Sequence, residues 1–466
     1  MESKARQILL VLFVGVLMGA LDIAIVGPAL PTIRNAFGED DRAMAWVFTT
    51  YVLFNLIGVP LMAKLSDTFG RRAIYILDVG LFAIGSLIVA LSPQLNVLLV
   101  GRALQGLGAG GIFPVASAVI GDTFPPEKRG SALGLIGAVF GIAFLLGPLL
   151  AGVMLGLLSW HWLFLINLPI AMLLMGMAWR LLPSTRLTRS FQFDWPGMIT
   201  LSVALAALTF AVNQLDTTQL MTSLVSGNVF PFVMLVVVLF PLFLWIETRA
   251  VNPIVQPALL RMPQVIVIAL VALGAGVSEA AVVFVPTLVV EAFGVSSASA
   301  SFMLLPAVLA MAVGSPTAGR LLDRVGSRLV LFISTVLTTA GLGVTALLGT
   351  QLLFFYVAIL LAGLGLGGLL GAPLRYVMLN EAPLSQRAAA QGLLTLHTSI
   401  GQLIGGAMVG AVAASFGGGV KGYAQAFLTV GLVMAVLSLL TLRLKGRAEE
   451  MATARANQAA PSVLMK

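Results

Sequence analysis

The sequence predicts an all-α membrane protein of about fourteen transmembrane helices, arranged as two bundles of six helices plus two inserted helices. Three observations support this fold class. The 466 residues are 59% hydrophobic and only 9% charged, whereas a globular protein has about 25% charged residues. The apolar residues form long runs separated by short charged bursts, and several motifs occur once in each half of the chain. A surface this poor in charge must face lipid over most of its area.

Each apolar run is long enough to cross a bilayer, which takes about 20 residues. The connections between the runs are short and leave no room for a soluble domain. We expect the first run to remain as a helix rather than a cleaved signal, because no polar mature domain follows it. The predicted spans are 7–30, 43–63, 73–92, 95–121, 131–155, 160–182, 195–214, 228–247, 263–290, 299–320, 328–348, 352–380, 388–414 and 424–444.

The basic residues predict the orientation. An even number of spans places both termini on one side of the membrane. Of the 26 Lys and Arg residues, Arg34, Arg42 and Lys421 fall on the opposite side and Arg102 and Arg375 fall within spans, while all the others lie on the side of the termini. Since cytoplasmic loops carry the excess of Lys and Arg, both termini are expected to be cytoplasmic, in a multi-pass protein of the bacterial plasma (inner) membrane.

An internal repeat relates the two halves. The motif G-x-G-x-x-G at 106–111 recurs 257 positions later at 363–368, and "AKLSDTFGRR" (63–72) recurs as "GRLLDRVGSR" (319–328). Asp22 and Glu279 are also 257 positions apart. Parallel repeats of this kind occur in transporters, with the substrate site between the halves. The predicted parts are the N-terminal bundle 1–190, two inserted helices in 191–250, the C-terminal bundle 251–445 and a cytoplasmic tail, 446–466.

The glycine motif has the spacing of a dinucleotide-binding loop, but that loop needs a strand, a turn and a helix. Here both copies lie inside apolar spans, so we expect grooves for close helix packing.

Other classes of protein are excluded by composition. There is no cysteine, the two histidines lack metal-ligand spacing, no ATP-binding G-x-x-x-x-G-K-[ST] is present, and the net charge of +8 is not gathered in a nucleic-acid surface. No cofactor is expected, and the proton gradient must supply the energy. An enzyme would need a converging nucleophile and base, which the scarce, symmetrically placed polar residues do not form.

Six motifs follow one another along the chain: "LDIAIVGPALPTI" (21–33), "LSDTFGRR" (65–72), "GRALQGLGAG" (101–110), "GPLLAG" (147–152), "SWHWLFLINLPI" (159–170) and "FDWPG" (193–197). Together they resemble the major facilitator superfamily and specifically its fourteen-helix drug:proton antiporter branch of multidrug efflux transporters. Ala24 and Gly27 replace a threonine and an asparagine usual in the branch, Ala63 replaces a leading glycine, and Thr68 replaces a basic residue.

Three charged residues and a histidine are the candidates for proton coupling or substrate contact. Arg102 is about 10 Å deep at 1.5 Å per residue, and Asp22 should reach a similar level, so the two are expected to form either a structural ion pair or a protonation switch. Glu279 has no such arginine, because Ile359 stands where Arg102 would recur. It is expected to carry a proton or contact a cationic substrate, or else to bond a neighbouring helix. For His397 we expect a hydrogen bond to another helix, or else a role in proton relay or substrate contact.

The remaining expectations follow from the resemblance, except that for Asp78, which follows from its place within a turn or two of a cytoplasmic helix end. It implies a cytoplasmic gate in which Asp67 caps a helix of the other half and Arg71 pairs with Asp122; the alternative is that the basic residues only fix the orientation. The fifth-helix motif is associated with export, and ordinary helix packing is its alternative. Asp78 is expected to snorkel or pair locally, and Arg375 to distinguish the substrate. The gate residues are Asp67, Gly70, Arg71, Arg72 and Asp122, with counterparts Asp323, Arg324 and Arg328, and the fifth-helix residues are Gly147, Pro148 and Gly152.

The predicted function is export of a lipophilic drug or toxic compound in exchange for protons by alternating access, as in antibiotic resistance. The acids Asp22 and Glu279 favour a cationic substrate, with a neutral or zwitterionic one as the alternative. Cavity walls rich in Met, Phe and Leu suit hydrophobic substrates. The expected partners are a small lipophilic substrate, protons and the lipid bilayer, with no nucleic acid, and the protein is expected to be a monomer. The alternative is an exporter of a lipid or other amphiphilic metabolite. A channel, which needs a continuous pore, is a further rival.

Overall fold

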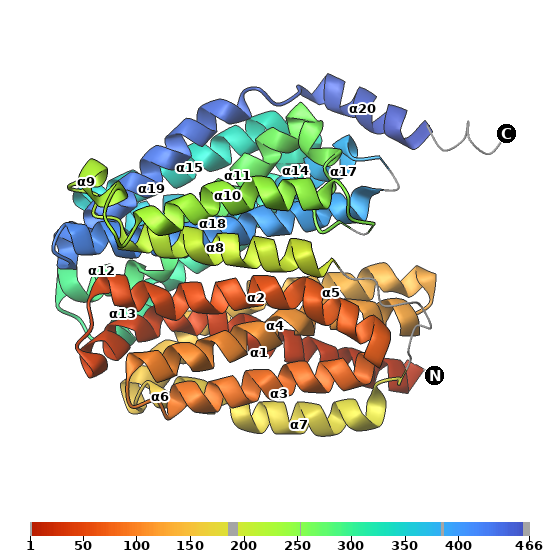
Figure 1. Cartoon of the computed structure of the whole chain (residues 1–466), viewed down its shortest axis with the longest axis horizontal. Helices are drawn as coiled ribbons and strands as arrows, with labels where there is room; N and C mark the ends of the chain where they lie inside the picture. The colour runs from red at the N-terminus through yellow and green to blue at the C-terminus, as the bar shows by residue number, and fades with distance from the viewer. Residues whose placement is uncertain (1, 185–193, 252, 384–385, 460–466) are drawn as a thin grey trace. The chain divides into compact units, whose positions relative to one another are not determined.

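The computed structural model describes residues 2–184, 194–251, 253–383 and 386–459, and the regular elements in these ranges are all helices (Figure 1). The all-α membrane fold is therefore confirmed. Contacts divide the chain into two compact units: Met1–Met198 with Val295–Met303, and Ile199–Gly294 with Leu304–Lys466. The finer division at 190, 250 and 445 stays a prediction.

The first unit is built around α4, which packs against α2 on one side and α3 on the other. A short helix from later in the chain, α13, packs on α5. The helices of this unit are α1 (Glu2–Phe37), α2 (Asp41–Phe69), α3 (Arg71–Ala90), α4 (Leu95–Thr123), α5 (Pro126–Leu157), α6 (His161–Leu165), α7 (Asn167–Leu181) and α13 (Ser297–Met303).

The second unit repeats this packing, with α16 against α14 and α15, and α11 against α18. Its helices are α8 (Trp195–Gln214), α9 (Leu220–Leu224), α10 (Phe230–Glu247), η1 (Leu259–Arg261), α11 (Pro263–Val283), α12 (Val285–Phe293), α14 (Leu305–Val325), α15 (Ser327–Leu348), α16 (Leu352–Leu370), α17 (Ala372–Glu381), α18 (Arg387–Ser415), α19 (Gly419–Thr441) and α20 (Arg447–Ala459).

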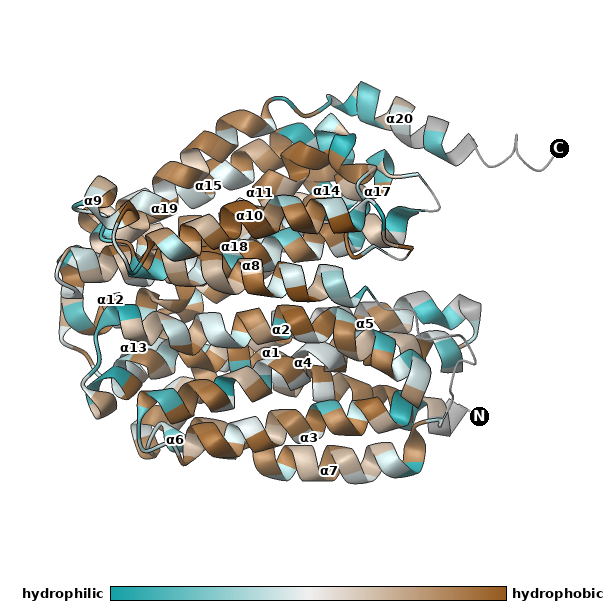
Figure 2. Cartoon of the chain, viewed as in Figure 1, coloured by the Kyte–Doolittle hydropathy of each residue, from teal (hydrophilic) through white to brown (hydrophobic). Residues whose placement is uncertain are grey.

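Thirteen helical segments of the described residues are long and apolar enough to cross a membrane, and each coincides with a predicted span. The run predicted at 131–155 falls in α5, where the described residues give a shorter apolar helix, Gly141–Leu157. In Figure 2 apolar residues extend along the long helices, whereas α20 is mostly polar. Four predicted single spans are in fact each divided between two helices: α6 and α7, α11 and α12, α13 and α14, and α16 and α17.

The glycine motifs bring helices into close contact, as the sequence predicted. A Cβ atom added at Gly106 would lie 2.3 Å from the Tyr51 carbonyl oxygen on α2, and one at Gly108 would lie 2.4 Å from the Asp78 carbonyl oxygen on α3. In the second copy, a Cβ at Gly363 would lie 2.3 Å from the Ala307 carbonyl oxygen on α14. Any larger residue would push the backbones apart, so neither copy is a cofactor loop.

The predicted tail contains a helix, α20, that docks on the second unit. Glu450 is 4% exposed and accepts a hydrogen bond from the backbone N–H of Ser327, at 3.2 Å, and another from the Ser327 hydroxyl. These bonds cap the N-terminus of α15. Arg447 donates to the Arg324 carbonyl oxygen, and Lys445 forms a 2.7 Å ion pair with Glu381. The segment is thus an integral part of the second unit.

Candidate functional site

The first unit contains a buried polar cluster centred on the predicted pair. Arg102 of α4 and Asp22 of α1 form an ion pair with an Nη1–Oδ2 distance of 2.5 Å, and both are 0% exposed. Gln105 accepts a hydrogen bond from Arg102 Nη1 at 2.8 Å and donates from Nε2 to Asp22 Oδ1 at 3.0 Å. The juxtaposition that the sequence predicted is therefore present, with a glutamine joining both partners.

Further polar groups surround this triad. Gln105 Nε2 also donates to the Ser86 hydroxyl of α3 at 2.8 Å, and Asn167 of α7 donates to the same hydroxyl at 3.2 Å. Gln105, Ser86 and Asn167 were not among the residues predicted from the sequence. Gln105 had a recognisable signal, since it follows Arg102 by three positions and thus shares its helix face. Ser86 and Asn167 had none, because their inward direction depends on the tertiary packing of α3 and α7.

The Arg102 guanidinium is held from two more directions. Nε donates to the Val47 carbonyl oxygen of α2 at 2.9 Å, and the guanidinium carbon lies 4.3 Å from the centroid of the Tyr51 ring. Nη2 is buried and has no hydrogen-bond partner among the described residues. Because a buried donor without a partner is costly, Nη2 is a point at which water or another acceptor would be bound favourably.

The cluster joins several helices of the first unit. The ion pair joins α1 to α4, and Gln105 and the Val47 carbonyl extend the network to α3 and α2. Protonation of Asp22 would remove the negative charge and leave a buried cation, since a guanidinium cannot release its proton. The arrangement can therefore convert uptake or release of one proton into a change in helix contacts.

Asp78 of α3 differs from its expectation of snorkelling or local pairing. It is 0% exposed, and neither carboxyl oxygen has a hydrogen-bond partner among the residues the structure describes. The carboxyl group packs on Gly111 of α4, where an added Cβ would lie 2.2 Å from Oδ2. The side chain is too short to leave the bundle, because α3 and α4 are in glycine-mediated contact at this level.

Glu279 of α11 lies half-buried in the second unit, and Gln402 of α18 interacts with its carboxyl group. Glycines allow this approach, since an added Cβ at Gly276 would lie 2.0 Å from the Thr398 carbonyl oxygen of α18. Ile359, the counterpart of Arg102, is buried. In the first repeat, Asp22 thus lies beside both an amide and a guanidinium. In the second, Glu279 lies beside the Gln402 amide, and an isoleucine stands where the guanidinium would recur.

His397 of α18 makes a different hydrogen bond from the one expected. Its Nδ1 lies 2.8 Å from the Leu393 carbonyl oxygen of the same helix, rather than on a group of a neighbouring helix. Since a carbonyl can only accept, Nδ1 carries the proton and Nε2 is the atom left to accept one. A four-residue separation places donor and acceptor on the same helix face, which explains this local bond.

The turn between α2 and α3 holds the predicted gate residues of the first unit together. Arg71 forms ion pairs with Asp67 at 2.5 Å and with Asp122 of α4 at 3.0 Å. Arg72 donates from Nε to the Leu182 carbonyl oxygen at 2.7 Å. Gly70 has φ +100°, a conformation that residues with a Cβ rarely adopt. The Arg71–Asp122 pair is as expected, while the contact of Asp67 with the other half stays a prediction.

The corresponding turn of the second unit has lost the ion pairs. Gly326 keeps a positive φ of +85°, but Asp323, Arg324 and Arg328 are exposed and form no ion pair among the described residues. The turn is held instead by α20 through Glu450. The two turns thus share a glycine with positive φ, but they do not share the ion pairs.

The fifth-helix motif lies against α1 and α13. An added Cβ at Gly147 would lie 2.4 Å from the Ala24 Cβ, so the small residues of the first-helix and fifth-helix motifs pack on each other. At Gly152 it would lie 2.8 Å from the Phe302 ring. Pro148 lies inside α5, which continues through it. Close helix contact is thus present, and the link to export stays a prediction.

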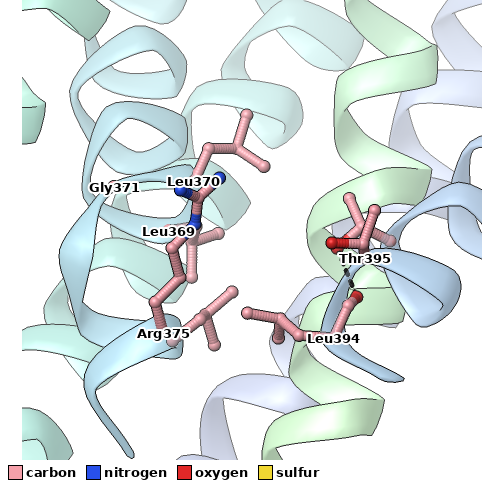
Figure 3. A pocket seen from close by; sticks show the side chains of 8 residues that line it. Leu369, Leu370, Gly371, Arg375, Leu394 and Thr395 are labelled. Atoms are coloured by element: carbon pink, nitrogen blue, oxygen red, sulfur yellow. Dashed lines mark hydrogen bonds between the residues drawn. The ribbon is translucent and has the colours of Figure 1, made fainter. Parts of the chain in front are cut away.

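Arg375 lines a cavity of about 120 Å³ in the second unit. Figure 3 shows its side chain reaching from α17 toward Leu369 and Leu370, opposite Leu394 and Thr395 of α18. Its place within a span was expected from the sequence, whereas the cavity was not.

Comparison with known proteins is informative about the whole chain. The family model described as Major Facilitator Superfamily matches residues 12–278 and 265–465. "Uncharacterized MFS-type transporter YfiU" of Bacillus subtilis (strain 168) is 36% identical over 406 residues, which are 86% of this chain and 78% of that protein. "Multidrug resistance protein 3" of the same organism is 36% identical over 255 residues, 55% of this chain and 49% of that protein.

A solved structure extends the likeness to three dimensions. It is that of a bacterial homolog to the human lysosomal transporter Spinster, in an inward-facing and unoccupied conformation. It matches with a TM-score of 0.68 at 16% sequence identity and covers 98% of this chain and 99% of that chain. At this identity the likeness concerns the fold alone.

Proposed function

This chain belongs to the major facilitator superfamily and is a secondary transporter, and we propose that it exports lipophilic compounds in exchange for protons by alternating access. The proposal includes the fourteen-helix drug:proton antiporter branch and both termini at the cytoplasmic side of a bacterial plasma membrane. The relative named as a multidrug resistance protein supports it, as do the motifs that resemble that branch.

One observation carries the coupling part of the proposal: the fully buried ion pair between Asp22 and Arg102. Charged groups inside a membrane are costly and are kept where they serve a function. In the proposed cycle Asp22 binds a proton, Arg102 loses its counter-charge, and the contacts between α1 and α4 weaken. Each charge moved is worth about 2.3 kcal/mol per 100 mV of membrane potential.

Glu279 is proposed as a second acidic group, used either to carry a proton or to contact a cationic substrate. Its setting supports this role, because its neighbour Gln402 is neutral and leaves the negative charge available. His397 is proposed as an accessory group whose Nε2 accepts a proton or a substrate hydrogen bond. The Arg71 ion pairs with Asp67 and Asp122 are proposed to break when the cytoplasmic side opens.

Transport in proteoliposomes tests the proposal. Purified protein is reconstituted, a pH gradient is imposed, and the movement of a cationic dye such as ethidium is followed by fluorescence. We expect movement driven by the gradient in the parent and its loss in Asp22→Asn, with Glu39→Gln, an exposed acid in the loop after α1, as the matched control. An Asp22→Asn protein that still moves dye against its gradient would remove Asp22 from the coupling role. Ion conduction of thousands of events per second would indicate a channel.

A further inference from the structure

The strongest unassigned feature is the cavity beside Arg375, which lies where a membrane span is interrupted. The predicted span 352–380 is two helices, and Gly371 between α16 and α17 has ψ −141°, outside the helical region. A broken helix at membrane depth is tolerated where it is buried or lines a cavity, and transporters use such breaks to build binding sites. The cavity of about 120 Å³ lies at this break.

The chemistry of the walls is one-sided. The lining is apolar except for a guanidinium and two hydroxyl groups, and none of the lining residues is acidic. Thr395 donates its hydroxyl proton to the Gln391 carbonyl oxygen at 3.1 Å, and Thr398 does so to Leu394 at 3.1 Å. The guanidinium is thus the group left to bind a ligand. The residues around the cavity are Leu369, Leu370, Gly371, Leu374, Arg375, Leu394, Thr395 and Thr398.

The Arg375 guanidinium has donors to offer. Its backbone oxygen accepts a hydrogen bond from Gln391 Nε2 at 3.1 Å, but within the described parts of the chain its side chain forms no ion pair and donates no hydrogen bond. Glu381, the acid of α17, is paired with Lys445 instead. A guanidinium binds a carboxylate, sulfonate or phosphate with two parallel hydrogen bonds.

From this geometry we propose that the Arg375 cavity binds the oxyanion group of a transported amphiphile. A drug-sized ligand fills about 300–1,000 Å³, so this cavity holds the charged group and a few attached carbons while the remainder lies outside it. The inference rests on the proposed transport function and gives it a substrate class: lipophilic compounds that bear an oxyanion, alone or together with a cationic group.

Two dyes with the same aromatic skeleton test the assignment. One, 8-anilinonaphthalene-1-sulfonate, bears a sulfonate, and the other, N-phenyl-1-naphthylamine, does not. Binding of each is measured by equilibrium dialysis to the full chain in phosphatidylcholine nanodiscs, with empty nanodiscs subtracted. The variants are Arg375→Gln and Arg375→Lys, with Arg180→Gln as the matched control, an exposed arginine at the end of α7.

We expect Arg375→Gln to weaken sulfonate binding about tenfold or more, as the loss of a charged hydrogen bond should. Arg375→Lys should weaken it less, because the charge remains without the paired donors. Binding of the uncharged dye should persist in all variants, which also shows that they are folded. Equal weakening of both dyes, or unchanged sulfonate binding, would overturn the proposal.

A second set of nanodiscs, which also contain phosphatidylglycerol, distinguishes a substrate from a bilayer lipid. Sulfonate binding that depends on Arg375 and survives there supports the transported amphiphile. Loss of that Arg375-dependent binding would mean that a lipid phosphate occupies the cavity, and would overturn the assignment. Transport is measured separately: a protein that moves neither these dyes nor ethidium in a pH gradient contradicts the proposed function, whereas the binding result stands independently of it.

Discussion

The Asp22–Arg102 ion pair gives the sharpest prediction, because its two single variants should fail for different reasons. Asp22→Asn leaves a 0% exposed guanidinium that cannot become neutral. Arg102→Gln leaves a carboxyl group that keeps the amides of Gln105 and Asn167 as partners and can become neutral by taking up a proton. Removing one partner of a buried pair costs about 3–5 kcal/mol.

We expect Asp22→Asn to cost about 3 kcal/mol, the lower end of that range, because Arg102 keeps the Val47 carbonyl oxygen and the Tyr51 ring. A domain of 150–250 residues loses about 2–4 °C of its unfolding midpoint per kcal/mol, so the midpoint should fall by about 6–12 °C. The double variant Asp22→Asn/Arg102→Gln should regain about 2 kcal/mol of the summed cost, since it contains no unpaired charge.

The assay is thermal unfolding in detergent, followed by the fluorescence of the six tryptophans, because the chain has no cysteine for thiol dyes. The deficit of Arg102→Gln should shrink as the pH falls, since protonation neutralises the lone carboxylate. That of Asp22→Asn should not respond in this way, because its unpaired charge is permanent. Additive effects of the two substitutions, or an Asp22→Asn midpoint equal to that of the parent, would refute the reasoning.

Three further predictions concern packing. Gly106→Ala should prevent stable folding, because its Cβ would lie 2.3 Å from a backbone oxygen. Gly121→Ala should be neutral or stabilising, because a Cβ there would have nothing within 4 Å. Expression levels and size-exclusion profiles of the two variants distinguish these outcomes. Asp78→Val should keep or raise the unfolding midpoint, since it removes buried oxygens without partners, and a fall of several degrees would reveal a missed partner. Glu450→Ala should cost about 1 kcal/mol as the loss of a helix cap and expose the α20 segment to limited proteolysis, while Glu450→Gln keeps an acceptor for Ser327 and should lose less.

The sequence predicted the features that depend on composition and on the repeat. Hydropathy located the spans because a bilayer requires long apolar runs. The pairing of Asp22 with Arg102 followed from their depths, since two buried charges of opposite sign have few other partners. The close packing at Gly106 and Gly363 followed from finding the same motif in two spans.

Other features depend on contacts that no local pattern records. The break at Gly371 has a local signal in Pro373, which stands in the first turn of α17, but nothing local records that a cavity lies beside Arg375, because the opposite wall comes from α18. Asp78 has the sequence context of a helix-end charge, and only the α3–α4 packing buries it. Glu450 belongs to a polar segment whose docking on Ser327 depends on residues 123 positions apart.

The two repeats also diverged in a way that limits inference from one to the other. The first repeat has ion pairs at two places, between Arg102 and Asp22 inside the bundle and at Arg71 in the turn. In the second, Ile359 stands in place of the arginine, and α20 holds the turn at Gly326 through Glu450. A transporter needs its halves to share a fold so that they can move as similar bodies, but that requirement constrains backbone and packing rather than charge. The packing of glycines in one repeat therefore predicts their packing in the other, whereas the contacts of charged residues have to be determined for each unit separately.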